Sequence, residues 1–153
     1  MTNHNDHHPQ DGRPDIAAAV IVRARRLLLV LSASPVPGMS PWRLPAGKIK
    51  PGEDPLATAV REAKEETGLD ATAIGTIGSR IHPDTGRLIH YVACTPADDT
   101  QIAHPSDPAI AAVCWLPEHQ IPIFVRSGLY QPVRDHVADL CRSNRSAPRG
   151  AGR

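Results

Sequence analysis

The stretch "GEDPLATAVREAKEETG", Gly52–Gly68, contains four of the five glutamates of this 153-residue chain. It predicts a helix over Pro55–Thr67, because Asp54 can cap the start, a proline suits the first turn and Gly68 suits the end. At 100° per residue, small and apolar side chains fall within about 60° of Leu56. These side chains are Ala59, Val60, Ala63 and Thr67. We expect this narrow stripe to pack closely against a sheet.

A second face of the same helix carries Glu62, Glu65 and Glu66. Like charges at this spacing cost about 0.2–0.5 kcal/mol per pair, and the three glutamates lie towards the C-terminal end of the helix, which disfavours anions. Patterns that weaken local stability tend to mark functional sites. Clustered carboxylate oxygens favour Mg²⁺ or Mn²⁺ over zinc, so we expect the three groups to converge on a shared cation. The alternative is a solvated helix face, with Glu62 paired to a nearby Arg or Lys.

The segment "PAGKIKPGE" precedes this helix, and its glycines let the backbone approach a ligand or metal closely. Its last residue, Glu53, lies eight positions before Arg61. A carboxylate can hold a guanidinium group through two parallel hydrogen bonds. The spacing therefore predicts a Glu53–Arg61 pair that fixes the loop on the helix.

These residues together resemble a known pattern. Gly47, five residues, Glu53, seven residues and then "REAKEETGL" at 61–69 resemble the Nudix box, G-x5-E-x7-R-E-U-x-E-E-x-G-U. All seven fixed letters match, and Ala63 is small for the first aliphatic position. "WRLPAGK" resembles the strand that leads into the box, with Ala46 where a second glycine is common. The chain thus resembles the Nudix hydrolases, MutT-like pyrophosphohydrolases, from about residue 15 to 140.

The resemblance implies an α/β (α+β) class fold, with a mixed β-sheet sandwiched between helices, α/β/α. It also implies Mg²⁺-dependent hydrolysis, with Mn²⁺ as a substitute, of a nucleoside diphosphate linked to another moiety. NTPs, nucleotide sugars, ADP-ribose and dinucleoside polyphosphates are substrates of this kind. The resemblance assigns the metal ligands to Glu62, Glu65, Glu66 and the Gly47 carbonyl. With the structural pair Glu53 and Arg61, the three glutamates form the expected catalytic set, and Glu66 is the first candidate for general base because it borders the apolar stripe.

Some relatives take their base from a loop outside the box. In "HPSDPAIAAVCWLPEHQ", at 104–120, Ala109 and Ala112 stand where glutamates of the familiar pattern would fall. Asp107 and Glu118 remain, and capping a turn is the favoured role for Asp107. A non-catalytic nucleotide-binding or sensor module with the same fold is therefore the alternative function.

Substrate recognition needs an aromatic face or a few polar groups, and this chain has only five aromatic residues. Tyr91 and Trp115 fall on expected strands and are interpreted as core residues. The substrate-binding candidates are Arg43, Trp42, Arg80, Arg87 and Tyr130, with His82 and His90 as further candidates to hold a phosphate.

Patterning elsewhere predicts strands at 15–22, 26–33, 71–82, 88–95 and 109–116, a short strand from 42, and a closing helix within 128–141. One Nudix domain over 15–141 is expected between disordered tails at 1–14 and 142–153. His4, His7 and His8 of the first tail could bind a metal weakly.

Net charge is +1 and the apolar runs are too short to span a bilayer, so neither a membrane nor a nucleic-acid partner is favoured. The start of the chain lacks the apolar stretch of a signal peptide, and three widely spaced cysteines argue against a disulfide framework. We therefore expect a cytoplasmic protein with a nucleotide-derived small-molecule substrate. A homodimer, and an RNA-processing role for the basic C-terminal tail, stay open.

Overall fold

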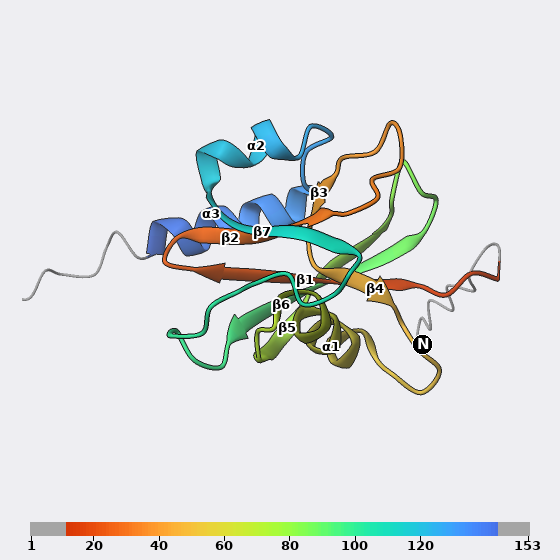
Figure 1. The fold of residues 1–153 in the computed structure, drawn as a ribbon, viewed down its shortest axis with the longest axis horizontal. Coiled ribbons are helices and arrows are strands. Elements are labelled where there is room, and N and C mark those ends of the chain that lie inside the picture. Colours follow the sequence, from red (N-terminus) through yellow and green to blue (C-terminus); the bar gives the residue numbers. More distant parts are fainter. Residues whose placement is uncertain (1–11, 144–153) are drawn as a thin grey trace, which may run out of the picture.

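The computed structural model describes residues 12–143, and the expectations for residues 1–11 and 144–153 lie outside that range. The strands are β1 (Ile16–Arg23), β2 (Arg26–Ser32), β3 (Trp42–Arg43), β4 (Ala46–Lys48), β5 (Ala71–Ile81), β6 (Leu88–Pro96) and β7 (Ile110–Pro117). The helices are α1 (Pro55–Thr67), the 3₁₀ turn η1 (Glu118–Gln120), α2 (Ile121–Phe124) and α3 (Gln131–Ser143). Figure 1 shows their arrangement.

Strand β1 organises the sheet. Its first part, Ile16–Ile21, pairs in parallel with β6, and its first residues also pair antiparallel with β4. Its last two residues form a hairpin with β2, which in turn pairs with β3 and β7. Strand β5 lies beyond β6 at the far edge. The sheet is therefore mixed, and β4 delivers the loop before α1 directly beside the central strand.

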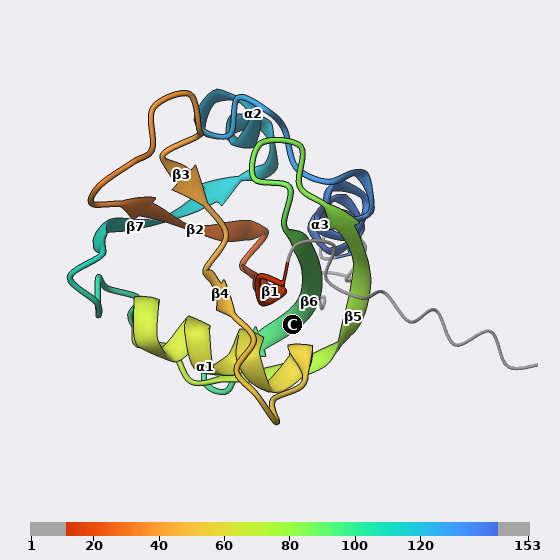
Figure 2. The same ribbon diagram turned by 90° about the vertical axis from the view of Figure 1, so that its right-hand side faces the viewer.

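Alternation along β1 divides the core into two layers. Ala17, Ala19 and Ile21 pack with Ala59 and Ala63 of α1. Ala18 and Val20 belong to the opposite layer, which also contains residues of α2 and α3. Successive side chains of a strand point to opposite faces, so one strand supplies both layers. Figure 2 shows α1 on one side of the sheet and α2 and α3 on the other, which confirms the expected α/β/α arrangement.

The sequence patterns locate most elements to within two residues. Helix α1 has the predicted bounds, whereas α3 starts at Gln131 and continues to Ser143, past the expected domain end at 141. The short η1 and α2 were not predicted, because four residues beginning Ile-Pro are too few to show a helical period. No helix among residues 12–143 is long and apolar enough to cross a membrane.

Candidate active site

Helix α1 is capped at both ends by the predicted residues. The amide of Ala57 donates to Asp54 Oδ1 at 2.7 Å, which satisfies one of the free donors of the first turn. Gly68 ends the helix with φ 74°, and its amide donates to the Lys64 carbonyl. A left-handed residue at this position favours glycine. The caps fix where α1 begins and ends, and the helical period then sets the relative positions of Glu62, Glu65 and Glu66.

The buried face of α1 differs from the predicted stripe. With Leu56 at zero, the buried residues run from Thr58 at about 200° to Thr67 at about 20°, so Glu66, at about 280°, lies near the middle of the arc. Leu56 is only half-buried. The expectation that Glu66 merely borders the apolar stripe was thus too weak. The reason is tertiary, because the 104–106 loop covers the end of α1 through bonds to the Glu66 and Thr67 carbonyls.

Arg61 ties the loop to the helix as expected. Its Nε and Nη2 donate to the two oxygens of Glu53 at 2.8 and 2.9 Å, and Nη2 also donates to the Lys48 carbonyl at 3.0 Å. The Lys50 amide and the Thr58 hydroxyl complete the bonds to Glu53. The Arg61 guanidinium and these two donors lower the pKa of Glu53 to about 2. At neutral pH the pair is therefore a charged brace between the loop and the helix.

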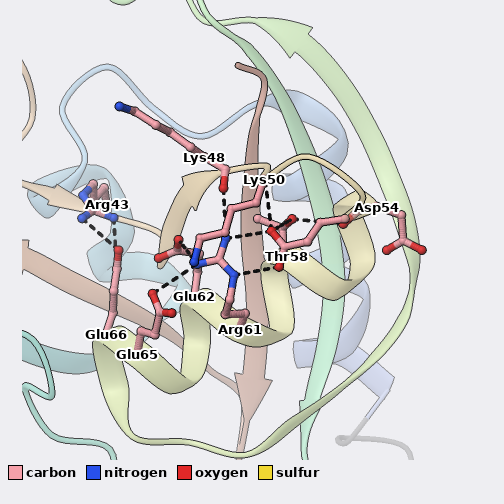
Figure 3. Close-up of polar contacts among 10 residues, drawn as sticks. Arg43, Lys48, Lys50, Asp54, Thr58, Arg61, Glu62, Glu65 and Glu66 are labelled. Atoms are coloured by element: carbon pink, nitrogen blue, oxygen red, sulfur yellow. Dashed lines mark hydrogen bonds and ion pairs between the residues drawn. The ribbon is translucent and has the colours of Figure 1, made fainter. Parts of the chain in front are cut away.

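The same guanidinium group serves two of the three clustered glutamates. Arg61 Nη1 lies 2.8 Å from Glu62 Oε1 and 3.2 Å from Glu65 Oε2 (Figure 3). The Glu62 side chain is 12% exposed and the Glu65 side chain 46%. Burial raises the pKa of Glu62, and Arg61 opposes that rise. The pairing of Glu62 with a nearby cation, considered as the alternative, is therefore present.

Glu66 has a different partner. Its carboxylate receives two hydrogen bonds of 3.2 Å from the Nη atoms of Arg43, which also donates to the Leu44 carbonyl. Glu66 is only 5% exposed. Burial raises its pKa to about 7, although Arg43 and the Ala46 amide favour the charged form. The sequence singled out Arg43 for substrate binding only, and nothing in its spacing from Glu66 reveals this bond.

The backbone at Gly47 lies directly against Glu62. A Cβ atom added at Gly47 would collide with the Glu62 carboxylate, so a residue with a side chain does not fit there without movement. The sequence analysis expected these glycines to let the backbone approach a ligand or metal, and the close approach present at Gly47 is to the Glu62 carboxylate. It brings the main chain of β4 next to the carboxylate row of α1.

The donor set suits a hard divalent cation. Glu62, Glu65 and Glu66 point to the same side of α1, and with the Gly47 main chain they offer only oxygen ligands (Figure 3). Yet across residues 12–143 no three acidic, His or Cys side chains lie in a ready metal-binding group. The predicted convergence on one point is therefore not met as the side chains stand. The three carboxylates stay apart because Arg61 attracts Glu62 and Glu65, whereas Arg43 binds Glu66.

A cavity of about 530 Å³ begins at Arg43 and Gly47 and runs away from α1. The five residues predicted to bind substrate all line it, namely Trp42, Arg43, Arg80, Arg87 and Tyr130. His82 lines it too, whereas His90 is bonded to Asp15 at 3.0 Å. The cavity wall and the carboxylate row thus meet at β3 and β4.

Two tyrosine rings in contact and an arginine line this cavity. Tyr91 and Tyr130 have ring centroids 5.1 Å apart, and the Arg80 guanidinium lies 5.2 Å from the Tyr130 centroid. Arg80 also donates to Tyr91 Oη at 3.1 Å. Tyr91 is buried, as expected for a core residue, but it also lines the cavity. The sequence pattern of its strand predicted that Tyr91 is buried, but it could not show that a cavity lies on that side of the sheet.

The N-terminal segment closes the rim of the cavity. Arg87 donates to the Pro14 carbonyl, and Arg13 donates to the Thr85 carbonyl at 3.3 Å. Arg13 and Pro14, assigned to the first tail, are thus bound to the β5–β6 hairpin. The Arg87 side chain therefore has a structural contact as well as a place in the lining.

The acidic residues outside the box lie elsewhere. Asp107 Oδ1 accepts a 2.7 Å bond from the Ala109 amide, which is the turn-capping role predicted for it. Glu118 begins η1 and lines a different cavity. Trp115 is partly buried, with the Arg23 guanidinium 4.4 Å from its ring centroid.

Comparison with known proteins agrees with this geometry. A model of the NUDIX domain matches residues 13–139. The chain is 32% identical to the CTP pyrophosphohydrolase of Escherichia coli K12 over 52% of this chain and 58% of that protein. It is 45% identical to the asymmetrical bis(5'-nucleosyl)-tetraphosphatase of Mus musculus over 42% of this chain and 40% of that one. The chain spans about half the length of these curated relatives.

Solved structures show the same fold. The crystal structure of a NUDIX hydrolase from Nitrosomonas europaea superposes with a TM-score of 0.67 at 20% identity, covering 83% of this chain and 71% of that one. The box residues, the α/β/α arrangement and the match over residues 13–139 have one common explanation. The chain belongs to the NUDIX domain family.

Proposed function

We propose that the protein is a divalent-cation-dependent hydrolase that cleaves the pyrophosphate linkage of a nucleoside diphosphate joined to another moiety. The observation that supports this most is the position of Glu66. It is a buried carboxylate near the middle of the inner face of α1, and it is bonded to an arginine that lines a cavity large enough for a nucleotide. The other oxygen ligands of the box belong to Glu62, Glu65 and the Gly47 main chain.

In this proposal Glu62, Glu65, Glu66 and the Gly47 carbonyl hold Mg²⁺ or Mn²⁺. When bound, the cation neutralises phosphate charge and orients the attacking water. Glu66 accepts the proton of that water, as a carboxylate close to the reacting atoms can. Arg43, which is shared between Glu66 and the cavity, binds a phosphate oxygen of the substrate.

The cavity receives the nucleoside in the same proposal. Trp42 and Tyr130 offer aromatic faces for a base, and Arg80 and Arg87 add positive charge beyond them. Relatives are named for CTP, for bis(5'-nucleosyl) tetraphosphates and, in Bacillus subtilis, as a putative 8-oxo-dGTP diphosphatase. The shared chemistry is a nucleoside attached to a chain of phosphates, and we propose that class as the substrate.

A substrate panel with product identification tests this function. The panel holds NTPs, oxidised dNTPs, ADP-ribose, dinucleoside polyphosphates and nucleotide sugars, each with Mg²⁺, with Mn²⁺ and with a chelator. We expect cation-dependent release of a phosphate-bearing product from at least one compound. If no compound is cleaved under any cation condition, the hydrolase proposal is wrong.

One observation favours the alternative of a non-catalytic nucleotide-binding module. Asp107 caps a turn and Glu118 faces another cavity, so neither is placed as a base for the box. Thermal stabilisation of the protein by a nucleotide, without cleavage of that nucleotide, would support this alternative.

Location and assembly complete the proposal. All three cysteines are free thiols, which suits a reducing cytoplasm. A homodimer stays a prediction, and size-exclusion chromatography with light scattering would test it.

A further inference from the structure

A second cavity, of about 660 Å³, lies between the β1–β2 turn, the η1–α2 segment and α3. Arg25, Arg26, Arg126 and Arg134 line it, and Glu118 is the only carboxylate in its wall. Its remaining surface is largely apolar and includes Ile121, Val125, Leu129 and Val137. The cavity therefore combines excess positive charge with an apolar floor.

The arginines of this cavity have few bonds to the rest of the protein. Within residues 12–143 the side chains of Arg25, Arg26 and Arg126 have no hydrogen bond or ion pair. In the same range the Arg134 side chain has a single hydrogen bond, of 3.4 Å to Gln131 Oε1. By contrast, Arg61 binds three carboxylates. The four arginine side chains that line this cavity therefore contribute few hydrogen bonds or ion pairs to the fold.

The turn that carries Arg25 does not favour an arginine. Ala24 and Arg25 have φ values of 49° and 61°, in the left-handed region where Asn-Gly is the usual hairpin pair. The Cys141 thiol donates to the Arg25 carbonyl at 3.4 Å and helps hold the turn against α3. Since the backbone would be more relaxed with Asn or Gly, turn formation does not explain the guanidinium group at this position.

A phosphorylated ligand fits this combination of charges and shape. Four like charges around a cavity repel one another, and a bound dianion reverses that repulsion. Guanidinium groups match phosphate oxygens through paired hydrogen bonds. We propose that this cavity binds a phosphomonoester, with its phosphate among Arg25, Arg26, Arg126 and Arg134 and its aromatic or aliphatic group on the apolar floor.

This site is separate from the substrate cavity, although the two share a wall. Val125, Gly128 and Leu129 of the α2–α3 connection line both cavities, whereas the four arginines line only the second. Variants and reporters must therefore come from residues that the cavities do not share. Ala24 and Arg134 report on the second cavity, and Gly47 and Arg80 report on the first.

The test is a titration of the full chain with phenyl phosphate in a chelating buffer, in which the NMR chemical shifts of the backbone amides are measured. We expect saturable shifts at Ala24 and Arg134 with a dissociation constant in the millimolar range or below. Inorganic phosphate should bind more weakly because it cannot use the floor, and phenol should cause no saturable shift there. Rising salt should weaken the binding, because the contacts are between exposed charges.

The decisive variant is Arg25→Asn combined with Arg126→Ala. Asparagine tolerates the left-handed region, so the turn should be kept while two cations are lost. We expect binding at least about tenfold weaker. Arg142→Ala is the matched control, because Arg142 is on α3, pairs with Asp139 and does not line the cavity.

Three results would each overturn the proposal. They are phenyl phosphate shifts confined to Gly47 and Arg80, equal binding by the double variant and the wild type, and inorganic phosphate binding as tightly as phenyl phosphate. The last would show that the floor contributes nothing, and the ligand would then not be a phosphomonoester.

Discussion

Two arginines hold the carboxylates of the box, and their surroundings differ. Arg61 binds Glu53 at a partly exposed position, where the pKa of Glu53 falls to about 2. Arg43 binds Glu66 inside the fold, where the pKa of Glu66 rises to about 7. Two glutamate–arginine pairs thus contain carboxylates whose pKa values shift in opposite directions.

Desolvation accounts for the difference. Around Glu53, the guanidinium and two further donors outweigh a small burial cost. Around Glu66, burial outweighs two hydrogen bonds from Arg43. The first pair braces the loop against the helix, and the second leaves a carboxylate that can gain or lose a proton near neutral pH. An ion pair by itself therefore does not reveal whether a glutamate is structural or reactive.

The largest expected effect is that of Glu66→Gln. The amide keeps the shape but can neither accept a proton as a carboxylate does nor bind a cation equally well. We expect turnover to fall at least about a hundredfold, with the fold intact. The measurement is the steady-state rate on a substrate from the panel, with circular dichroism as the check on folding. Glu118→Gln, at the other cavity, is the control, and wild-type rates for Glu66→Gln would refute the role given to Glu66.

The same substitution at both arginines sharpens the comparison. Lysine keeps the charge but loses the fork of donors. Arg43→Lys should lower kcat/KM by about tenfold, because Arg43 both holds Glu66 and lines the cavity. Kinetics at saturating cation measure this. An unchanged kcat/KM would show that a point charge is enough there.

Arg61→Lys should act mainly on stability. It removes short bonds to Glu53, to Glu62 and to the Lys48 carbonyl, which join the loop to the helix. We expect a loss of about 1–2 kcal/mol in the free energy of unfolding, measured in urea. Because β4, which leads into this loop, contains Gly47, activity should fall as well. If Arg61→Lys were as stable as wild type, the brace would contribute nothing to the fold.

The smallest effect is a pair of opposite pH dependences in the metal-free protein. Glu53 has a folded pKa below the ordinary 4.5, so its stabilisation is full above pH 4.5 and is lost as pH falls towards 2. Glu66 has a raised folded pKa, so its contribution is greatest below 4.5 and is lost as pH rises through about 7.

Denaturation of two variants across pH separates these contributions. The stability advantage of wild type over Glu53→Gln should shrink on acidification below pH 4.5. The advantage of Glu66→Gln over wild type should grow between pH 4.5 and 7. Parallel pH curves for wild type and both variants would contradict the contrast between the two sites.

Much of the fold was readable from local patterns. Helix α1 was predicted with its true bounds because its caps, Asp54 and Gly68, act on their own turn. The long strands β1, β2, β5, β6 and β7 were predicted because alternating or continuous apolar runs depend only on neighbouring residues. The single short strand expected from residue 42 is instead divided into β3 and β4. Helix α2 was missed because four residues are too few to show a helical period, and the burial of Ile121 in the core depends on residues distant in the sequence.

The sequence by itself determined the box. Glu53 and Arg61 are joined across the start of a helix, where the geometry is local. The positions of Glu62, Glu65 and Glu66 on that helix are local as well. Only the tertiary structure decided that Glu66 is buried, that Arg43 binds it and that Gly47 lines the 530 Å³ cavity. The physical reason is distance along the chain. Covalent geometry and helical period fix what lies within a few turns, whereas burial and the partner of a charge depend on which distant strands and loops fold against it.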